Sequence, residues 1–85
     1  MQQRQRWLHP VDEQLVATLD GTGIEYVPVL ATDIGVEPTF AAQRVERLVA
    51  LGLVERVTPE PVYRVTSEGR ARLDESATRP VRSVS

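Results

Sequence analysis

Residues 28–65, PVLATDIGVEPTFAAQRVERLVALGLVERVTPEPVYRV, contain two helical patterns followed by two strand patterns. The helical patterns begin near Pro28 and at Pro38, and proline suits the first position of a helix. Gly35 between them permits the left-handed backbone of a tight turn. The second helix is expected over residues 38–51, because Gly52 follows as a stop signal. The order of these elements predicts a helix–turn–helix.

The strand patterns cover residues 53–57 and 62–65, which are rich in β-branched valine. The four residues between them include two prolines, which cannot continue a strand because they lack a backbone N–H. A β-hairpin after a helix–turn–helix is the layout of a winged helix-turn-helix, whose second helix fits the major groove of DNA. The pattern therefore points to nucleic-acid binding rather than to catalysis.

The flanking segments add two further helices. A helix over residues 10–19 is predicted from apolar residues that recur at spacings of three and four. These residues are Leu8, Val11, Leu15 and Leu19. Residues 24–27 are expected to be extended and are a candidate strand beside the hairpin, and Thr66 is a good N-cap for a last helix that ends near Glu75. The predicted fold class is α+β, a three-helix core with a β-hairpin wing and a short C-terminal helix.

Eighty-five residues, 41% of them hydrophobic, supply one modest core. We expect residues 7–75 to form the domain, residues 1–6 a flexible polar arm, and residues 76–85 (SATRPVRSVS) a disordered tail. No window approaches the roughly 18–20 apolar residues of a membrane span, and the N-terminus lacks the apolar run of a signal peptide. A cytoplasmic protein without membrane contact is therefore expected. The lack of cysteine excludes disulfides and cysteine-ligated zinc fingers.

The charge of the chain supports DNA binding less strongly than the pattern of helices and strands does. The net charge is −2, whereas DNA-binding domains are commonly basic. Residues 36–65 are neutral, because they carry four arginines and four glutamates. All ten basic residues are arginine, which pairs with guanine and phosphate through two hydrogen bonds. Codon bias in a GC-rich genome explains this preference as well.

Helical periodicity gives the helix predicted over residues 38–51 two sides. Its core side carries Ala41, Val45, Leu48, Val49 and Gly52. Its opposite side carries Thr39, Gln43, Glu46 and Arg47, with Phe40 and Arg44 on the flank. The N-terminal part of such a helix reaches base edges in the major groove. The candidate base contacts are therefore Thr39, Phe40, Gln43, Arg44 and Arg47.

The hairpin supplies candidate phosphate contacts. Arg56 and Arg64 are expected to lie near each other across the two strands and to hold the DNA backbone beside the groove. Glu60 at the tip of the hairpin would repel phosphate. We therefore expect the strands, rather than the tip, to support the helix on DNA.

Several side chains have a structural explanation beside the functional one. Arg44 and Arg47 could pair with glutamates one helical turn away. Phe40 either touches DNA or packs against the first helix, and Trp7 is expected to cover that helix as part of the core. His9 lacks the partners that a metal site or a catalytic triad needs. The sequence indicates no enzyme, cofactor, metal or small-molecule ligand.

Five segments carry a likeness to a known family. They are EYVPVLA (25–31), IG (34–35), LGLVE (51–55), VYRVT (62–66) and EGRA (68–71). Over about residues 7–73 the chain resembles small haloarchaeal winged helix-turn-helix proteins of the phage PhiH repressor type, and more distantly the MarR and ArsR regulator folds. The resemblance implies a DNA-binding transcription regulator, with a repressor as the expected type. The recognition-helix positions of the family fall on the five candidate base contacts named above.

We therefore expect sequence-specific binding of double-stranded DNA for transcription control, with residues 38–51 in the major groove. A homodimer on a palindromic site is a hypothesis drawn from the small size of the module, with the N-terminal arm or the C-terminal helix as its interface. The alternative is a winged-helix protein–protein interaction module without direct DNA binding, which the neutral surface also fits. RNA binding would need exposed aromatic side chains, for which only Phe40 and Tyr63 are candidates.

Overall fold

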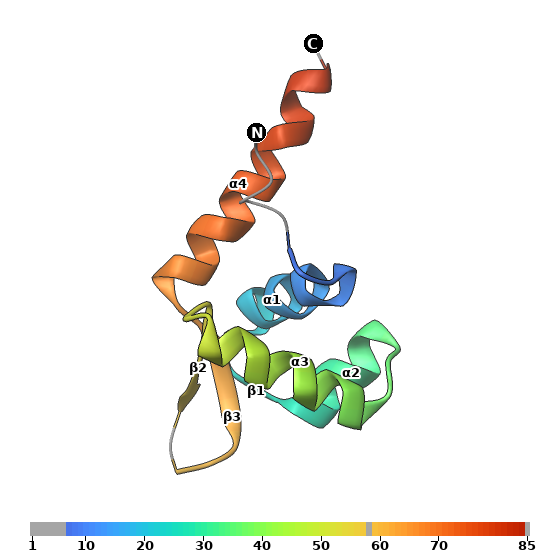
Figure 1. Cartoon of the computed structure of the whole chain (residues 1–85), viewed down its shortest axis with the longest axis vertical. Helices are drawn as coiled ribbons and strands as arrows, with labels where there is room; N and C mark the ends of the chain where they lie inside the picture. Colours follow the sequence, from blue (N-terminus) through green and yellow to red (C-terminus); the bar gives the residue numbers. More distant parts are fainter. Residues whose placement is uncertain (1–6, 58, 85) are drawn as a thin grey trace.

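The computed structural model describes residues 7–57 and 59–84, with side chains described as far as Ser76. The described residues form four helices and a three-stranded antiparallel sheet. The elements are α1 (Pro10–Thr22), β1 (Glu25–Tyr26), α2 (Val27–Ile34), α3 (Pro38–Ala50), β2 (Val54–Val57), β3 (Val62–Val65) and α4 (Ser67–Val84). Figure 1 shows α1, α2 and α3 grouped together, the hairpin of β2 and β3 projecting beside them, and α4 extending away from this body. The predicted α+β winged helix-turn-helix is confirmed.

The turn between α2 and α3 follows the sequence signals closely. Gly35 adopts the left-handed conformation with φ of 75°, and the next N–H, that of Val36, donates to the carbonyl of Ala31 at 3.0 Å. The Glu37 carboxylate then accepts the N–H of Phe40 at 3.0 Å and caps the start of α3. These two caps fix where each helix of the motif ends and begins.

The core lies where the helices meet the inner side of the sheet. Its buried side chains are Leu15, Val16, Leu19, Leu30, Ala31, Ala41, Val45, Leu48, Leu53, Val54 and Tyr63. The predicted core side of α3 is confirmed for the three buried residues Ala41, Val45 and Leu48. Gly52 was wrongly placed on that side, because it lies exposed in the turn after α3.

The apolar stripe predicted for α1 needs a correction. Leu8 is 61% exposed, because it precedes the helix and the helical period does not apply to it. The buried stripe instead consists of Asp12, Leu15, Val16 and Leu19, which have the spacing of one helical face. The acidic residue on this stripe is therefore a structural feature and not only a favourable charge at the helix N-terminus.

The sheet has the strand order β1-β3-β2, so the extended segment before α2 does pair with the hairpin. In the register of β2 and β3, Glu55 lies opposite Arg64, and Arg56 lies opposite Tyr63. Neighbouring residues of a strand point to opposite faces of a sheet. Arg56 and Arg64 are therefore on different faces, and the prediction that they lie close together is wrong.

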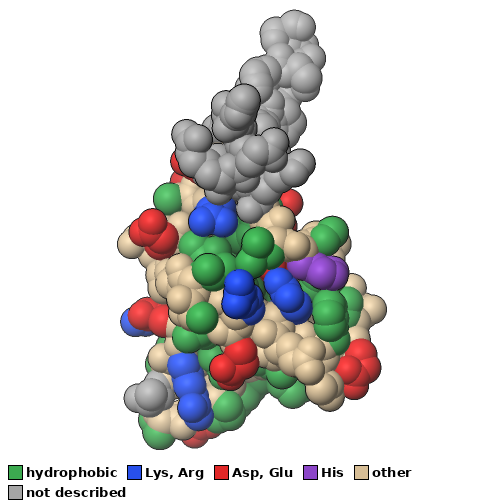
Figure 2. Space-filling view, in the orientation of Figure 1, with side chains coloured by type: hydrophobic (Ala, Val, Ile, Leu, Met, Phe, Trp, Pro, Cys, Tyr) green, Lys and Arg blue, Asp and Glu red, His purple; other side chains and the backbone are tan. Residues whose placement is uncertain are grey.

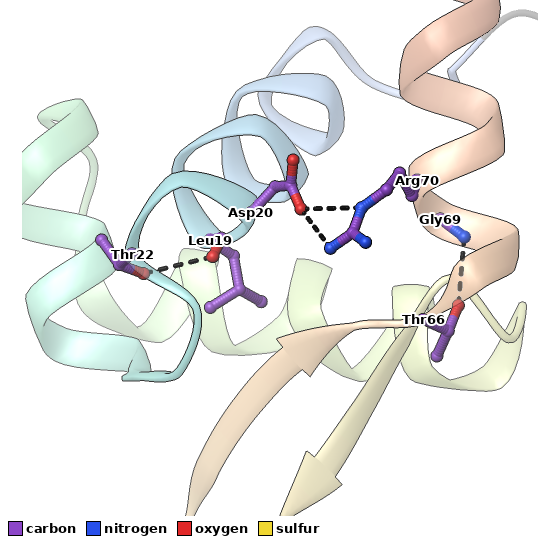
Figure 3. Close-up of polar contacts among 6 residues, drawn as sticks. All are labelled: Leu19, Asp20, Thr22, Thr66, Gly69 and Arg70. Carbon is purple, nitrogen blue, oxygen red and sulfur yellow. Dashed lines mark hydrogen bonds and ion pairs between the residues drawn. The ribbon is translucent and has the colours of Figure 1, made fainter.

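The junction between α4 and the core is built from short polar contacts (Figure 3). The hydroxyl of Thr66 accepts the N–H of Gly69 at 3.0 Å, which confirms the predicted N-cap. The same hydroxyl donates to the carbonyl of Gly52 at 2.7 Å. Arg70 donates twice to one carboxylate oxygen of Asp20 on α1, at 3.1 and 2.7 Å. The first turn of α4 is thus tied to both the end of α3 and the end of α1.

Trp7 covers the core from the N-terminal side, as predicted. Its ring packs against the buried cluster, and its Nε1–H donates to the hydroxyl of Ser76 at 2.9 Å. The guanidinium of Arg72 lies 5.5 Å from the ring centroid, within cation–π range. Trp7 therefore packs between the core and the middle of α4.

The last helix is longer than the sequence indicated. Its predicted end near Glu75 is wrong, because α4 continues through Pro80 to Val84. No glycine follows Gly69, so the usual C-cap signal is missing from this stretch. The division into an arm, a domain and a tail stays a prediction, and residues 1–6 lie outside the described residues. None of the helices in the described part of the chain has the length and apolar character needed to cross a bilayer.

Candidate nucleic-acid interface

The solvent side of α3 presents four exposed polar side chains. They are Thr39, Gln43, Glu46 and Arg47. Three of these positions, 39, 43 and 47, are spaced by four residues and form one stripe along the helix. Because Ala41, Val45 and Leu48 anchor the opposite side in the core, the orientation of this stripe toward solvent is fixed by packing. The periodicity predicted this arrangement correctly.

Arg44 is not on the free surface of α3. Its Nε and one terminal nitrogen donate to the two carboxylate oxygens of Asp12 at 2.9 and 2.8 Å. The Asp12 side chain is 1% exposed and that of Arg44 is 22% exposed. The hydrogen bond with Asp12 raises the pKa of the Arg44 guanidinium, although burial acts in the opposite direction. The structure therefore pairs this arginine across two helices rather than with a glutamate on its own helix.

Asp12 was missed as a site residue. The signal that would have found it is its spacing of three and four from Leu15 and Val16, because an acid on an apolar stripe needs a buried partner. The partner could not be read from the sequence, because it lies 32 residues away on another helix.

Phe40 packs against the start of α1. Its ring meets that of His9 edge-on, with 5.3 Å between the ring centroids. His9 is held in place as the N-cap of α1, because its Nδ1 accepts the N–H of Val11 at 3.1 Å. Of the two interpretations of Phe40, the structure thus shows the packing one, and His9 has the structural role expected of it.

The two hairpin arginines differ in their partners. Arg64 donates to the carboxylate of Glu55 at 2.6 Å, and the two side chains are 53% and 47% exposed. Exposed ion pairs of this kind contribute about 0–1 kcal/mol, so a phosphate can replace Glu55 at little cost. Within residues 7–57 and 59–76, neither Arg56 nor the helical Arg47 makes an ion pair. Both are exposed.

The wing tip is tied back to the first strand. The phenol of Tyr26 donates to the Glu60 carboxylate at 2.8 Å. This hydrogen bond and the negative charge of Glu60 raise the pKa of Tyr26, because the phenol must keep its proton to donate. The wing tip thus carries an acidic side chain that is hydrogen-bonded to β1.

Positive charge on this face is interrupted. Figure 2 shows basic side chains over α3 and over the hairpin, with acidic side chains and neutral surface between them. In the part of the chain that the structure describes, no group of three or more histidine, cysteine or acidic side chains is arranged to hold a metal ion. The surface therefore offers hydrogen-bonding groups and separate cations, and not a broad basic patch.

Comparison with known proteins identifies similar structures. No protein-family model matches the sequence, and no curated protein matches it. The oxidised form of MarR from E. coli superposes with a TM-score of 0.73 and 21% identity, over 80% of this chain and 52% of that one. A MepR-like protein complexed with pseudoligands gives 0.73 and 26%, over 84% and 54%. A MarR family transcriptional regulator from Silicibacter pomeroyi DSS-3 gives 0.69 and 30%, over 85% and 53%.

This chain spans about half the length of each of these proteins. The superposed part includes most of the described residues and therefore most of the winged helix-turn-helix. The structural neighbours of the chain are MarR-family winged-helix regulators.

Proposed function

We propose that this protein is a sequence-specific DNA-binding transcription regulator that inserts α3 into the major groove. The observation that carries the proposal is the exposed stripe of Thr39, Gln43 and Arg47 on α3. It lies on a helix whose other side is anchored in the core, at the position that reads bases in helix-turn-helix proteins. The similarity to MarR-family regulators, one of them described as a transcriptional regulator, supports the same function.

Each side chain of the stripe suits a base edge. The Gln43 amide can pair with N6 and N7 of adenine, and the Arg47 guanidinium can pair with O6 and N7 of guanine. Thr39 near the start of α3 can donate or accept. Arg56 and Arg64 would hold phosphates from the wing, where they fix the register of the helix without reading sequence.

We extend this proposal to the direction of regulation, repression or activation, and to the oligomeric state. The sequence likeness to PhiH-type repressors makes repression the sign that we propose. A homodimer would double the roughly 600–1,000 Å² that a single module buries on DNA. We place its interface on α4, which extends away from the body of the molecule (Figure 1). Sedimentation at high concentration should show a dimer, and a stable monomer that binds a single half-site would contradict this part of the proposal.

A protein–protein interaction module is the second candidate function. It is favoured by one observation: Arg44 and Arg64, two of the four arginines near the proposed interface, are already paired with carboxylates. Such pairing lowers the positive charge that is available for phosphates. In this case α3 and the wing would bind a protein surface and DNA would not compete.

The two functions are separated by a DNA titration at several salt concentrations. Genomic fragments selected by the purified full chain should share a short motif, and binding to it should weaken linearly on a log–log plot against salt. Arg56→Ala should lower the slope of this plot by about one for each protomer bound to the DNA. Arg70→Ala is the matched control, because the guanidinium of this arginine is paired with Asp20 on α1 and is not among the proposed phosphate contacts, so the slope should stay unchanged. If no sequence is enriched at any salt concentration, the DNA-binding function is wrong.

A further inference from the structure

Two residues of α3, Phe40 and Arg44, contact α1 instead of facing solvent with the exposed stripe. We infer that they position α3 for DNA and do not read bases themselves. Their partners are the N-cap residue of α1, His9, and the buried Asp12. The inference rests on the proposed function and narrows it, because it reduces the five predicted base contacts to three.

The geometry of the ion pair holds Arg44 in one orientation. Both carboxylate oxygens of Asp12 are engaged, by Nε at 2.9 Å and by a terminal nitrogen at 2.8 Å. Two parallel hydrogen bonds fix the plane of a guanidinium as well as its position. If Arg44 turned toward a base, it would leave the charge of Asp12 buried without a partner, which is among the costlier changes in a protein interior. Contacts between Arg44 and DNA would have to offset this cost before they could increase the binding affinity.

The contact between the rings of Phe40 and His9 holds the turn of α3 that precedes Arg44. Phe40 and Arg44 are four residues apart and lie side by side on one flank of the helix. Their partners are also adjacent, because the N–H of Asp12 donates to the carbonyl of His9 at 2.9 Å. His9 in turn is fixed by the capping bond from Val11. The N-terminal half of α3, which enters the groove, is thus held at two successive positions by the first turn of α1.

This arrangement predicts which residues carry specificity. Thr39, Gln43 and Arg47 choose the bases, and the contacts with α1 set the angle and depth at which these side chains meet the groove. When a positioning contact is lost, every sequence should be bound less tightly by a similar factor. When a base-reading contact is lost, the preference at one base pair should relax.

The substitution Asp12→Asn tests whether Arg44 positions α3, because loss of a positioning contact should lower the affinity for DNA. This substitution keeps the shape of the side chain and releases Arg44 from a charged partner. If Arg44 positions α3, the full chain should bind its selected DNA about three- to thirtyfold more weakly, with unchanged base preferences. Arg47→Ala, measured beside it, should change the preference at one base pair. Equal or tighter binding by Asp12→Asn would show that the ion pair does not position α3 and would overturn the inference.

A double variant covers the case in which Asp12→Asn does not fold. Asp12→Leu with Arg44→Met replaces the ion pair by apolar side chains, and such replacements of buried pairs are often tolerated. Its selected motif should match that of the wild type at every position. A motif that relaxes at one base pair would mean that Arg44 reads that base.

Hydrogen exchange tests the positioning role without DNA. In Asp12→Asn the exchange of the α3 amides should accelerate about tenfold more than that of the β2 and β3 amides, which report the loss of global stability. Equal exchange in α3 would overturn the inference even if DNA binding is confirmed. A wild-type protein that selects no DNA would instead overturn the proposed function, and faster exchange in α3 would still support the helix contact.

Discussion

Gly69 of α4 lies directly against the backbone carbonyl of Leu53, and a Cβ atom on residue 69 would overlap that oxygen. The same atom would also lie 2.8 Å from Cγ1 of Val65. The carbonyl of Leu53 is held in place, because it accepts the N–H of Thr66 at 3.1 Å. Glycine at this position therefore allows α4 to start against the end of the helix-turn-helix.

The first prediction concerns this close approach. Gly69→Ala should lower the free energy of unfolding by about 3 kcal/mol, the upper end for overpacking, because a backbone oxygen cannot move aside easily. Gly21→Ala is the matched control: Gly21 is also helical, but nothing lies within 4 Å of its added Cβ. The control should be neutral or stabilise the protein by up to about 1 kcal/mol. Urea denaturation measures both, and equal effects would contradict the contact.

Thr66 carries the second prediction. Its hydroxyl caps α4 and also donates to the carbonyl of Gly52. Thr66→Val keeps the shape but removes both hydrogen bonds, so it should cost about 1–2 kcal/mol of stability. Thr32→Val is the control, because the exposed hydroxyl of Thr32 bonds only within its own helix. Thermal unfolding should show a clear decrease in Tm for the first variant and little change for the second.

The elements of this fold were predictable because their signals are local. The turn at Gly35, the start of α3 at Pro38 and the N-cap at Thr66 each depend on residues within a few positions of one another. The solvent stripe of α3 followed from periodicity alone. The length of α4 was not predictable in this way, because residues 76–85 are polar and include a proline, which is typical of a disordered tail, whereas α4 continues to Val84.

The partners of the site residues depend on tertiary structure. Nothing near Arg44 in the sequence indicates Asp12, and the register of the hairpin decides that Arg64 meets Glu55 and not Arg56. A shift of one residue between the strands would move every side chain to the other face. The sequence therefore predicted which residues could be in the site, but not which of them are already engaged.

The two helix-to-helix ion pairs should differ in their effect on stability. Arg44→Ala leaves a buried carboxylate unpaired and should cost about 3 kcal/mol. Arg70→Ala removes the pair with Asp20, in which both side chains are more exposed, and should cost less than about 1 kcal/mol. Chemical denaturation in low and high salt checks this, since only the exposed pair should weaken with salt. Equal costs would mean that the Asp12–Arg44 pair is not formed as described.

The contact between Tyr26 and Glu60 predicts a pH effect at the wing. The hydrogen bond raises the pKa of Tyr26 in the folded protein, so its stabilising contribution is complete below the ordinary tyrosine pKa of about 10. It is lost as the pH rises through the raised value. Glu60→Gln should lower the pKa of Tyr26 toward the ordinary value, as followed by the ultraviolet absorbance of tyrosinate. The experiment is done in Tyr63→Phe, because the chain has two tyrosines. An unchanged titration would contradict the hydrogen bond.

The central claim, that the exposed stripe of α3 reads DNA sequence, is tested most directly by one parallel selection. The wild-type chain and its Arg47→Ala variant are each allowed to select from the same random duplex pool at one salt concentration. The wild type should enrich a short motif. The variant should bind that motif about 1–3 kcal/mol more weakly and lose the preference at one base pair while keeping the others. Identical motifs and affinities for the two proteins, or no enriched motif for the wild type, would contradict the claim.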